Sequence, residues 1–249
     1  MVDAASDGTN AITATNCPTC TSMANYTKRI ACLANSRKHS GRCIAGKEIL
    51  ADGHGPWVRP ISARPSAEVS EEERRYENGQ DPRTLDIIDV PIIAATPILF
   101  QTENHVIDTG CYWTKVGELP WTTLADLVDE FPTLWVNGDS TYQGLNDRVK
   151  LEEASKLVSS LALIKPQKLT IVVQTEGETF GNPRRRVRAH FRHNNCQYIL
   201  VVTDPMSERT FLARSNGSYS LTDAYLCVSL GEPHSDGYCY KLVAAIIGK

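Results

Sequence analysis

Short runs of apolar and β-branched residues, bounded by polar and turn-rich segments, recur along much of the chain, which is the pattern of β-strands. These stretches fall into two groups. The predicted strands of the first group cover residues 28–35, 43–50, 57–61, 85–100 and 112–116. Those of the second group cover residues 168–175, 184–192, 198–203, 225–230 and 238–247. Pro91 and Pro97 interrupt the stretch 85–100, so we expect two strand pieces or an edge strand there.

Between the two groups, apolar residues recur at intervals of three and four, which favours helices. One helix is predicted to open at Pro120 and to reach Phe131, and a second is predicted over residues 151–164. Within the second group, Asp204 and Pro205 are typical of an N-cap followed by proline at the first helical position. They predict a short helix that ends at Leu212.

Each group of strands has about the size of a small barrel of the oligonucleotide/oligosaccharide-binding (OB) kind. We therefore predict a mostly β, α+β protein with a helical insert, in which two small OB-like barrels are joined by a helical segment. The predicted units are a disordered tail (1–22), a first barrel (23–118), a helical connector (119–164) and a second barrel (165–249). A single mixed α+β domain with five or six strands is the alternative.

The composition is that of a folded globular protein, with 41% apolar and 22% charged residues. It contains no apolar run of the roughly 18 residues that a membrane span needs. The first 22 residues carry neither the basic nor the apolar region of a signal peptide. Most of the eight cysteines lie in apolar runs such as ACLA, YLCVSL and YCYKLV, where cysteine acts as a small buried hydrophobe. We therefore expect a reduced, cytoplasmic protein.

Cys17 and Cys20 form a single CxxC pair near the start of the chain. A structural zinc site has four ligands, and no second CxxC or HxxxH follows. We therefore favour a loose tail with two incidental cysteines over a metal site, and we expect neither a metal nor a cofactor.

The net charge of −3 conceals a strong asymmetry along the chain. Residues 28–59 hold seven basic and two acidic residues, and residues 163–249 hold eleven basic and seven acidic ones. Between them, residues 60–162 hold eight basic and eighteen acidic residues. Two basic blocks thus flank an acidic middle, which is typical of a protein with an anionic partner, although such asymmetry also arises by accident.

The most basic segment is the predicted strand 184–192. Alternation places five basic residues on one face: Arg184, Arg186, Arg188, His190 and Arg192. Val187, Ala189 and Phe191 lie on the other face and can enter the core. Guanidinium groups bind phosphate through two parallel hydrogen bonds, so we expect phosphate contacts here. A solvated basic edge strand and a strand docked on the acidic middle of the chain are the alternatives.

A second candidate site is the loop 36–42, whose Arg37, Lys38 and Arg42 stand among small residues that let backbone N–H groups approach a phosphate. The spacing is not that of a P-loop. Close by in sequence, Trp57 beside Arg59 can stack on a nucleobase if its ring is exposed. A buried Trp57 in the core is the alternative.

Motifs for catalysis are absent from the sequence. It contains no GxSxG, no HExxH and no GxGxxG. Without a nucleophile or a set of metal ligands at a typical spacing, we expect a binding protein, although catalytic residues scattered without a motif would also fit.

Several stretches together resemble the dual OB-containing domain family, which is found among bacterial proteins associated with conflict and anti-phage systems. The similarity runs in order through residues 28–38, 41–46, 57–62, 117–121, 134–138, 225–233 and 240–245. The resemblance implies two OB-like barrels and a role in binding nucleic acid or nucleotides. It assigns no catalytic residue.

We therefore predict a cytoplasmic, non-catalytic protein that binds nucleic acid, with single strands favoured, through the strand 184–192 and the loop 36–42. Action in anti-phage defence, together with a protein partner from the same system, is part of what the resemblance implies. A nucleotide or small-anion sensor and a protein–protein interaction subunit are the alternatives.

Overall fold

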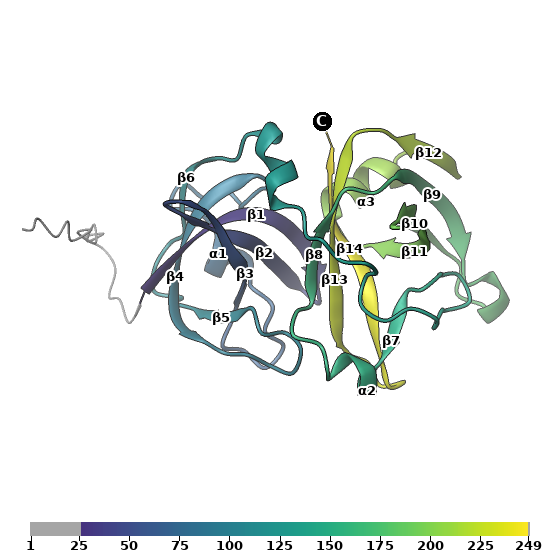
Figure 1. Cartoon of the computed structure of the whole chain (residues 1–249), viewed down its shortest axis with the longest axis horizontal. Coiled ribbons are helices and arrows are strands. Elements are labelled where there is room, and N and C mark those ends of the chain that lie inside the picture. Colours follow the sequence, from purple (N-terminus) through teal and green to yellow (C-terminus); the bar gives the residue numbers. More distant parts are fainter. Residues whose placement is uncertain (1–25, 249) are drawn as a thin grey trace, which may run out of the picture.

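A computed structural model describes residues 26–248, which form two β-barrels packed against each other (Figure 1). The strands of the first sheet are β1 (Tyr26–Lys38), β2 (Gly41–Leu50), β3 (Gly53–Ile61), β4 (Asp86–Ala95), β5 (Asn104–Ile107) and β6 (Thr114–Glu118). Those of the second are β7 (Arg148–Lys150), β8 (Leu161–Ile164), β9 (Lys168–Glu176), β10 (Arg184–His193), β11 (Cys196–Val202), β12 (Gly217–Leu221), β13 (Ala224–Pro233) and β14 (Tyr238–Gly248). The helices are short: α1 (Glu71–Arg74), η1 (Trp121–Leu127), α2 (Leu151–Ala154), η2 (Glu178–Phe180) and α3 (Pro205–Leu212). The predicted mostly β fold with a small helical content is confirmed.

In the first barrel, hydrogen bonds join the strands in the order β1-β2-β3-β5-β4, and β4 returns to pair with β1. β3 and β5 run parallel, and α1 lies between β3 and β4 in the sequence. A closed five-stranded Greek-key path of this kind is the OB topology. Gly46 permits the close approach of β1 and β2, because a Cβ at this position would lie 2.1 Å from the carbonyl oxygen of Ala31.

The second barrel closes along an equivalent path. β9, β10 and β11 are antiparallel neighbours, β11 pairs in parallel with β14, and β14 pairs with β13. β13 pairs with β8 at Leu226–Ile164, and β12 pairs with β9 at Leu221–Leu169. These antiparallel pairs share one register, because the step from the first pair to the second is five residues back on one side and five residues forward on the other. β8 with β9 and β12 with β13 therefore act as two long, bent strands, and their pairing closes the barrel.

A hydrophobic seam joins the two barrels. Alternate residues of β1 point into the first barrel (Ile30, Cys32) or into the seam (Ala31, Leu33). Residues of β8, β13 and β14 meet them there, which is where Figure 1 places these three strands, between the barrels. The members of the seam from β1–β3 and from the second barrel are Ala31, Leu33, Ala34, Ala45, Trp57, Leu161, Leu163, Tyr225, Cys227, Ala244, Ala245 and Ile247. The outer face of β1–β3 is thus largely covered by the second barrel.

Asp129, in the segment that follows η1, reinforces this seam. One of its carboxylate oxygens binds Lys47 Nζ of β2 at 2.6 Å. The other accepts hydrogen bonds from Trp57 Nε1 of β3 at 3.0 Å and from the backbone N–H of Leu163 of β8 at 2.8 Å. A single side chain therefore satisfies buried donors from both barrels.

The helical predictions are correct in one case and wrong in part in two. α3 begins at Pro205 and ends at Leu212, and the Asp204 side chain accepts a hydrogen bond from Met206 N as its N-cap. The helix predicted from Pro120 is a 3-10 helix that ends at Leu127. The helix predicted over 151–164 is wrong beyond Ala154, because Leu161–Ile164 form the strand β8.

The buried cysteines behave as their apolar sequence context predicts: Cys32, Cys227 and Cys239 are each fully buried. Burial raises the pKa of the Cys32 thiol to about 12 and that of Cys239 to about 11, which keeps both protonated at neutral pH. Cys17, Cys20 and the predicted tail 1–22 lie outside the described residues. Within residues 26–248, no helix has the length and apolar character needed to cross a membrane.

Candidate nucleic-acid interface

The outer face of β9, β10 and β11, which we call the open face, carries the basic residues predicted from the sequence. β10 lies in the middle of it, paired with β9 on one side and β11 on the other. Val187, Ala189 and Phe191 point inward and are buried in the barrel core, as predicted. The residues that point outward are Lys168, Thr170, Val172 and Gln174 on β9, Arg184, Arg186, Arg188, His190 and Arg192 on β10, and Gln197 and Ile199 on β11.

Four cations of the open face form no ion pair with a carboxylate of the described residues: Lys168, Arg184, Arg186 and Arg192. The charge of Arg186 nevertheless helps to lower the pKa of Glu176. Arg184 donates only to the amide oxygen of Asn182, at 3.2 Å. All four side chains are exposed. An unpaired row of cations repels itself, so an incoming polyanion relieves that repulsion and gains charge-assisted hydrogen bonds.

Arg188 differs from its neighbours, because it is only 6% exposed and paired with Glu176 of β9. Two hydrogen bonds join them, at 2.6 and 3.0 Å. Burial raises the pKa of Glu176, but the hydrogen bonds from Arg188 and Gln174 outweigh it, and the net pKa is lowered. Through this ion pair, Arg188 contributes to the packing beneath the open face.

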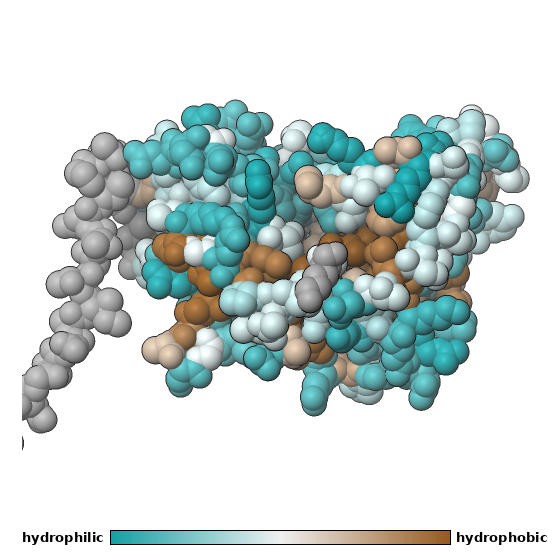
Figure 2. All heavy atoms as spheres, turned by 90° about the horizontal axis from the view of Figure 1, so that it is seen from above, coloured by the Kyte–Doolittle hydropathy of each residue, from teal (hydrophilic) through white to brown (hydrophobic). Residues whose placement is uncertain are grey.

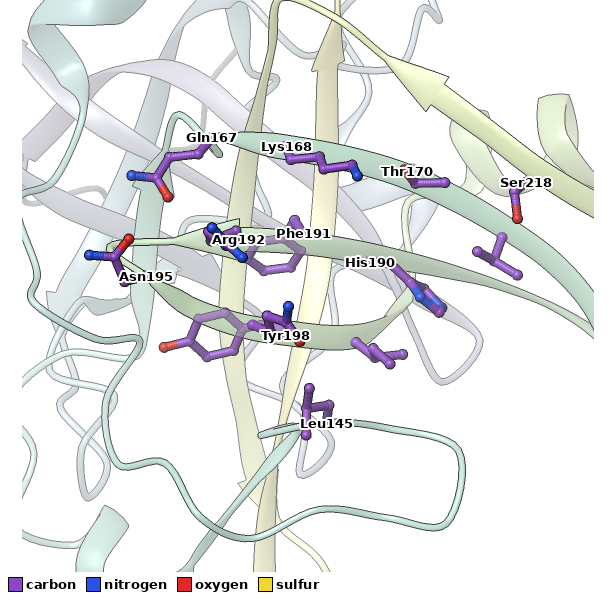
Figure 3. A pocket seen from close by; sticks show the side chains of 13 residues that line it. Leu145, Gln167, Lys168, Thr170, His190, Phe191, Arg192, Asn195, Tyr198 and Ser218 are labelled. Carbon is purple, nitrogen blue, oxygen red and sulfur yellow. The ribbon is translucent and has the colours of Figure 1, made fainter.

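One end of the open face is hollowed into a groove of about 1030 Å³ (Figure 3). Lys168 on β9 and Arg192 on β10 lie there as cross-strand neighbours, and Figure 3 shows them side by side. Amide and hydroxyl groups that can read base edges line the same groove: Gln167, Thr170, Asn195, Gln197 and Ser218. The groove thus offers charge for phosphate and hydrogen-bonding groups for bases.

His190 lies farther along the groove, beyond Arg192 on β10. Burial lowers the pKa of His190, and the nearby Arg188 guanidinium lowers it further. Its Nε2 atom is buried and has no hydrogen-bond partner among the described residues. In the free protein at neutral pH this side chain is therefore predominantly neutral.

The other end of the open face carries two exposed aromatic rings that sequence reasoning missed. Tyr142 and Phe180 are 81% and 77% exposed, and their rings pack edge to face with centroids 6.5 Å apart. They line a hollow of about 450 Å³ together with Arg184 and Arg186. Exposed aromatic rings beside arginine are a stacking platform for unpaired bases.

Phe180 owes its position to the tight loop between β9 and β10. Gly177 opens the loop with φ of +82°, and its carbonyl oxygen accepts hydrogen bonds from Phe180 N and Asn182 N. A Cβ on Gly177 would lie 2.4 Å from the carbonyl oxygen of Asn182, so the loop requires glycine there. The signal in the sequence is an aromatic residue within a turn-rich stretch, EGETFGNP.

The segment 136–147 forms one wall of the open face. Leu145 exchanges two backbone hydrogen bonds with Ile199 of β11, which fixes the wall against the sheet. Behind it, the fully buried Lys241 of β14 donates from Nζ to Val136 O at 2.7 Å and to Asn137 Oδ1 at 2.8 Å. Burial lowers the pKa of Lys241 to about 7. Tyr142 is thus carried by a segment anchored at several points.

The second predicted site, the loop 36–42, lies at the contact with the other barrel. Arg37 forms an ion pair with Glu208 of α3, and Lys38 pairs with Glu232 of β13 at 2.6 Å. The backbone N–H of Arg37 donates to Thr203 O at 2.9 Å. These two cations therefore bind carboxylates of the same chain, whereas the half-buried Arg42 has no such partner among the described residues. None of the residues of this loop lines either hollow of the open face.

Trp57 and Arg59 are buried, and the expectation of an exposed stacking ring at Trp57 is wrong. Trp57 is 9% exposed in the seam, because the second barrel covers β3. Arg59 is 3% exposed. Its Nη2 atom lies 3.1 Å from Glu103 Oε1 and donates a hydrogen bond to Ser160 Oγ at 2.8 Å. Both residues support the packing of the barrels.

Fold and site together define a class, that of proteins with paired OB barrels in which one barrel presents a basic, aromatic-edged face. The sequence matches the Dual OB-containing domain over residues 28–246. The chain therefore belongs to this family, as the resemblance implied. No significant match exists among curated proteins or among solved structures.

Proposed function

We propose that this chain is a non-catalytic protein that binds single-stranded nucleic acid on the open face of its second barrel. The observation that carries the proposal is the combination of four cations without an ion pair on one OB sheet and two exposed aromatic rings at its edge. Glu178 is the one carboxylate of the hollow beside Phe180 that has no partner among the described residues. The cations outnumber it, so the face favours a polyanion.

The aromatic pair favours a single strand over a duplex. Stacking on Tyr142 or Phe180 requires the flat face of a base, and bases in a duplex are already stacked on one another. The polar side chains of the groove also reach base edges more readily when the bases are unpaired. Bacterial anti-phage defence, with a protein partner, is the setting that the family resemblance suggests, and we include it in the proposal together with the cytoplasmic location that we expect from the composition.

Binding to a fluorescently labelled single-stranded oligonucleotide of about 12 nucleotides is expected to weaken steeply with salt. Four phosphate contacts predict a slope of about −3 for the logarithm of the association constant against the logarithm of salt concentration. Fluorescence anisotropy at several salt concentrations measures the slope, and a duplex of the same length is the control. Salt-independent binding, or a duplex that binds as tightly as the single strand, would contradict the proposal.

Binding is also expected to strengthen as the pH falls from about 8 to about 6, because a phosphate near His190 favours its protonated form. The pKa of His190 is lowered in the free protein, so the bound strand raises it and the complex takes up a proton. The gain is about threefold to tenfold in affinity. This gain in affinity should disappear in His190→Gln, whereas His234→Gln, the matched change at an exposed histidine, should retain it. An unchanged pH profile in His190→Gln would rule out this role.

A further inference from the structure

A second cavity, of about 870 Å³, lies where the two barrels meet. The first barrel contributes Asn35 of β1, Arg42 of β2 and the segment 80–84, and the second contributes the start of α3 and Ile246 of β14. This cleft has the volume of a small-molecule site and the inter-domain location where such sites are common. None of the residues that line it lines either hollow of the open face.

The two carboxylates of the cleft are already bound within the chain. Asp81 holds the buried Arg74 through hydrogen bonds of 2.5 and 3.2 Å. Asp204 caps α3, accepting from Met206 N at 3.0 Å and Ser207 Oγ at 2.6 Å, and it also accepts from Ile246 N at 3.3 Å. Both carboxylates also act electrostatically on Arg42 and raise its pKa, but neither forms a hydrogen bond or an ion pair with Arg42, Arg83 or Arg209.

Three arginines of the same cleft have no such partner. The side chains of Arg42, Arg83 and Arg209 form no hydrogen bond and no ion pair with any residue that the structure describes. Arg42 is half-buried. Burial and the neighbouring guanidinium groups of Arg74 and Arg37 lower its pKa, Asp81 and Asp204 raise it, and the net pKa is lowered. A half-buried guanidinium beside other cations is costly unless an anion joins it.

The remaining walls of the cleft are suited to a flat, weakly polar group. Apolar surface comes from Pro82, Pro205, Met206 and Ile246. Met206, in the first turn of α3, is 74% exposed. Figure 2, which views the molecule from above, shows hydrophobic residues near the middle of that view, with hydrophilic residues around them. Hydroxyl and amide groups of Thr84, Ser207 and Gln80 complete the lining.

We propose that this cleft is a second binding site, separate from the open face, and that it takes a mononucleotide. The phosphates bind the free arginines, and the base lies against the apolar wall. An anion alone would leave the apolar wall unused, and a nucleoside alone would leave the guanidinium groups unpaired. A mononucleotide satisfies both parts of the lining.

The test uses isothermal titration of the full chain with ATP, adenosine and inorganic pyrophosphate. ATP is expected to bind at least about tenfold more tightly than either of the other two probes. Arg42→Gln and Arg209→Gln are each expected to weaken ATP binding by about tenfold to a hundredfold, because each removes a charge-assisted contact. Arg209 is exposed on α3, so its variant tests the site without disturbing the fold.

The matched control is Arg184→Gln with Arg186→Gln, which removes cations from the open face and should leave ATP binding unchanged. Three outcomes overturn the proposal: ATP that does not bind, ATP that loses affinity in the open-face variant but not in Arg42→Gln or Arg209→Gln, and pyrophosphate or adenosine that binds as tightly as ATP. Oligonucleotide binding that survives in Arg209→Gln keeps the two sites distinct, so this proposal can fail while the function of the open face stands.

Discussion

Replacing Arg184 and Arg186 together by glutamate is expected to weaken oligonucleotide binding by at least a hundredfold. Both side chains are exposed beside Tyr142 and Phe180, so the change removes two phosphate contacts and adds two repulsive charges at the stacking platform. Charge-assisted hydrogen bonds contribute about 1.5–3 kcal/mol each, and two of them account for this loss. Fluorescence anisotropy at constant salt measures it.

The control for this variant changes the net charge equally at a distant place. Lys150→Glu with Lys156→Glu alters two exposed lysines, one at the end of β7 and one just after α2, and neither lines the open face. Affinity should fall only slightly in the control. If both double variants lose the same affinity, net charge and not the open face controls binding. Arg188 is unsuitable for this experiment, because its replacement would leave Glu176 buried without its partner.

The second large effect concerns stability. Asp129→Ala is expected to lower the free energy of unfolding by about 3–5 kcal/mol, because it leaves a buried charge uncompensated. Lys47, whose side chain is 6% exposed, loses its only ion pair among the described residues. Trp57 Nε1 and Leu163 N also lose their acceptor. Urea unfolding followed by tryptophan fluorescence measures the change.

Asp126→Ala is the matched control for Asp129→Ala, because Asp126 lies three residues earlier and is exposed. Its cost should stay below about 0.5 kcal/mol. Adding Lys47→Met to Asp129→Ala should restore part of the lost stability by removing the unpaired charge. Equal stability of the two alanine variants would show that Asp129 does not tie the barrels together.

Most of the long strands could be predicted from their apolar, turn-bounded runs, whereas β5, β7, β8 and β12 were not predicted, and β8 shows one reason. Leu161 and Leu163 face the seam, and Ala162 and Ile164 face the core of the second barrel. A strand buried on both faces has no polar alternation, so its apolar run cannot be told from part of a helix. The helix α3 was predictable because Asp204 and Pro205 act locally, without help from the rest of the fold.

From the sequence, the candidate site could be predicted only for the residues of the strand 184–192. Alternation within 184–192 correctly separates the inward Val187 from the outward Arg186. The pairing of Arg188 with Glu176 depends on strand register, which one strand does not specify. Tyr142 reaches the open face through the path of the connector, and Trp57 is covered by the other barrel. Both results depend on contacts between segments far apart in the sequence.

The covered outer face of β1–β3 limits how many open sheets the molecule offers for the proposed binding. Two similar barrels offer two equivalent sheet faces, yet the seam leaves one of them accessible. Under the proposed function, each chain would hold one nucleic-acid strand, and bringing two nucleic-acid strands together would require two chains. Separating the barrels would uncover apolar surface on both halves, so we expect the two barrels to stay together as one unit.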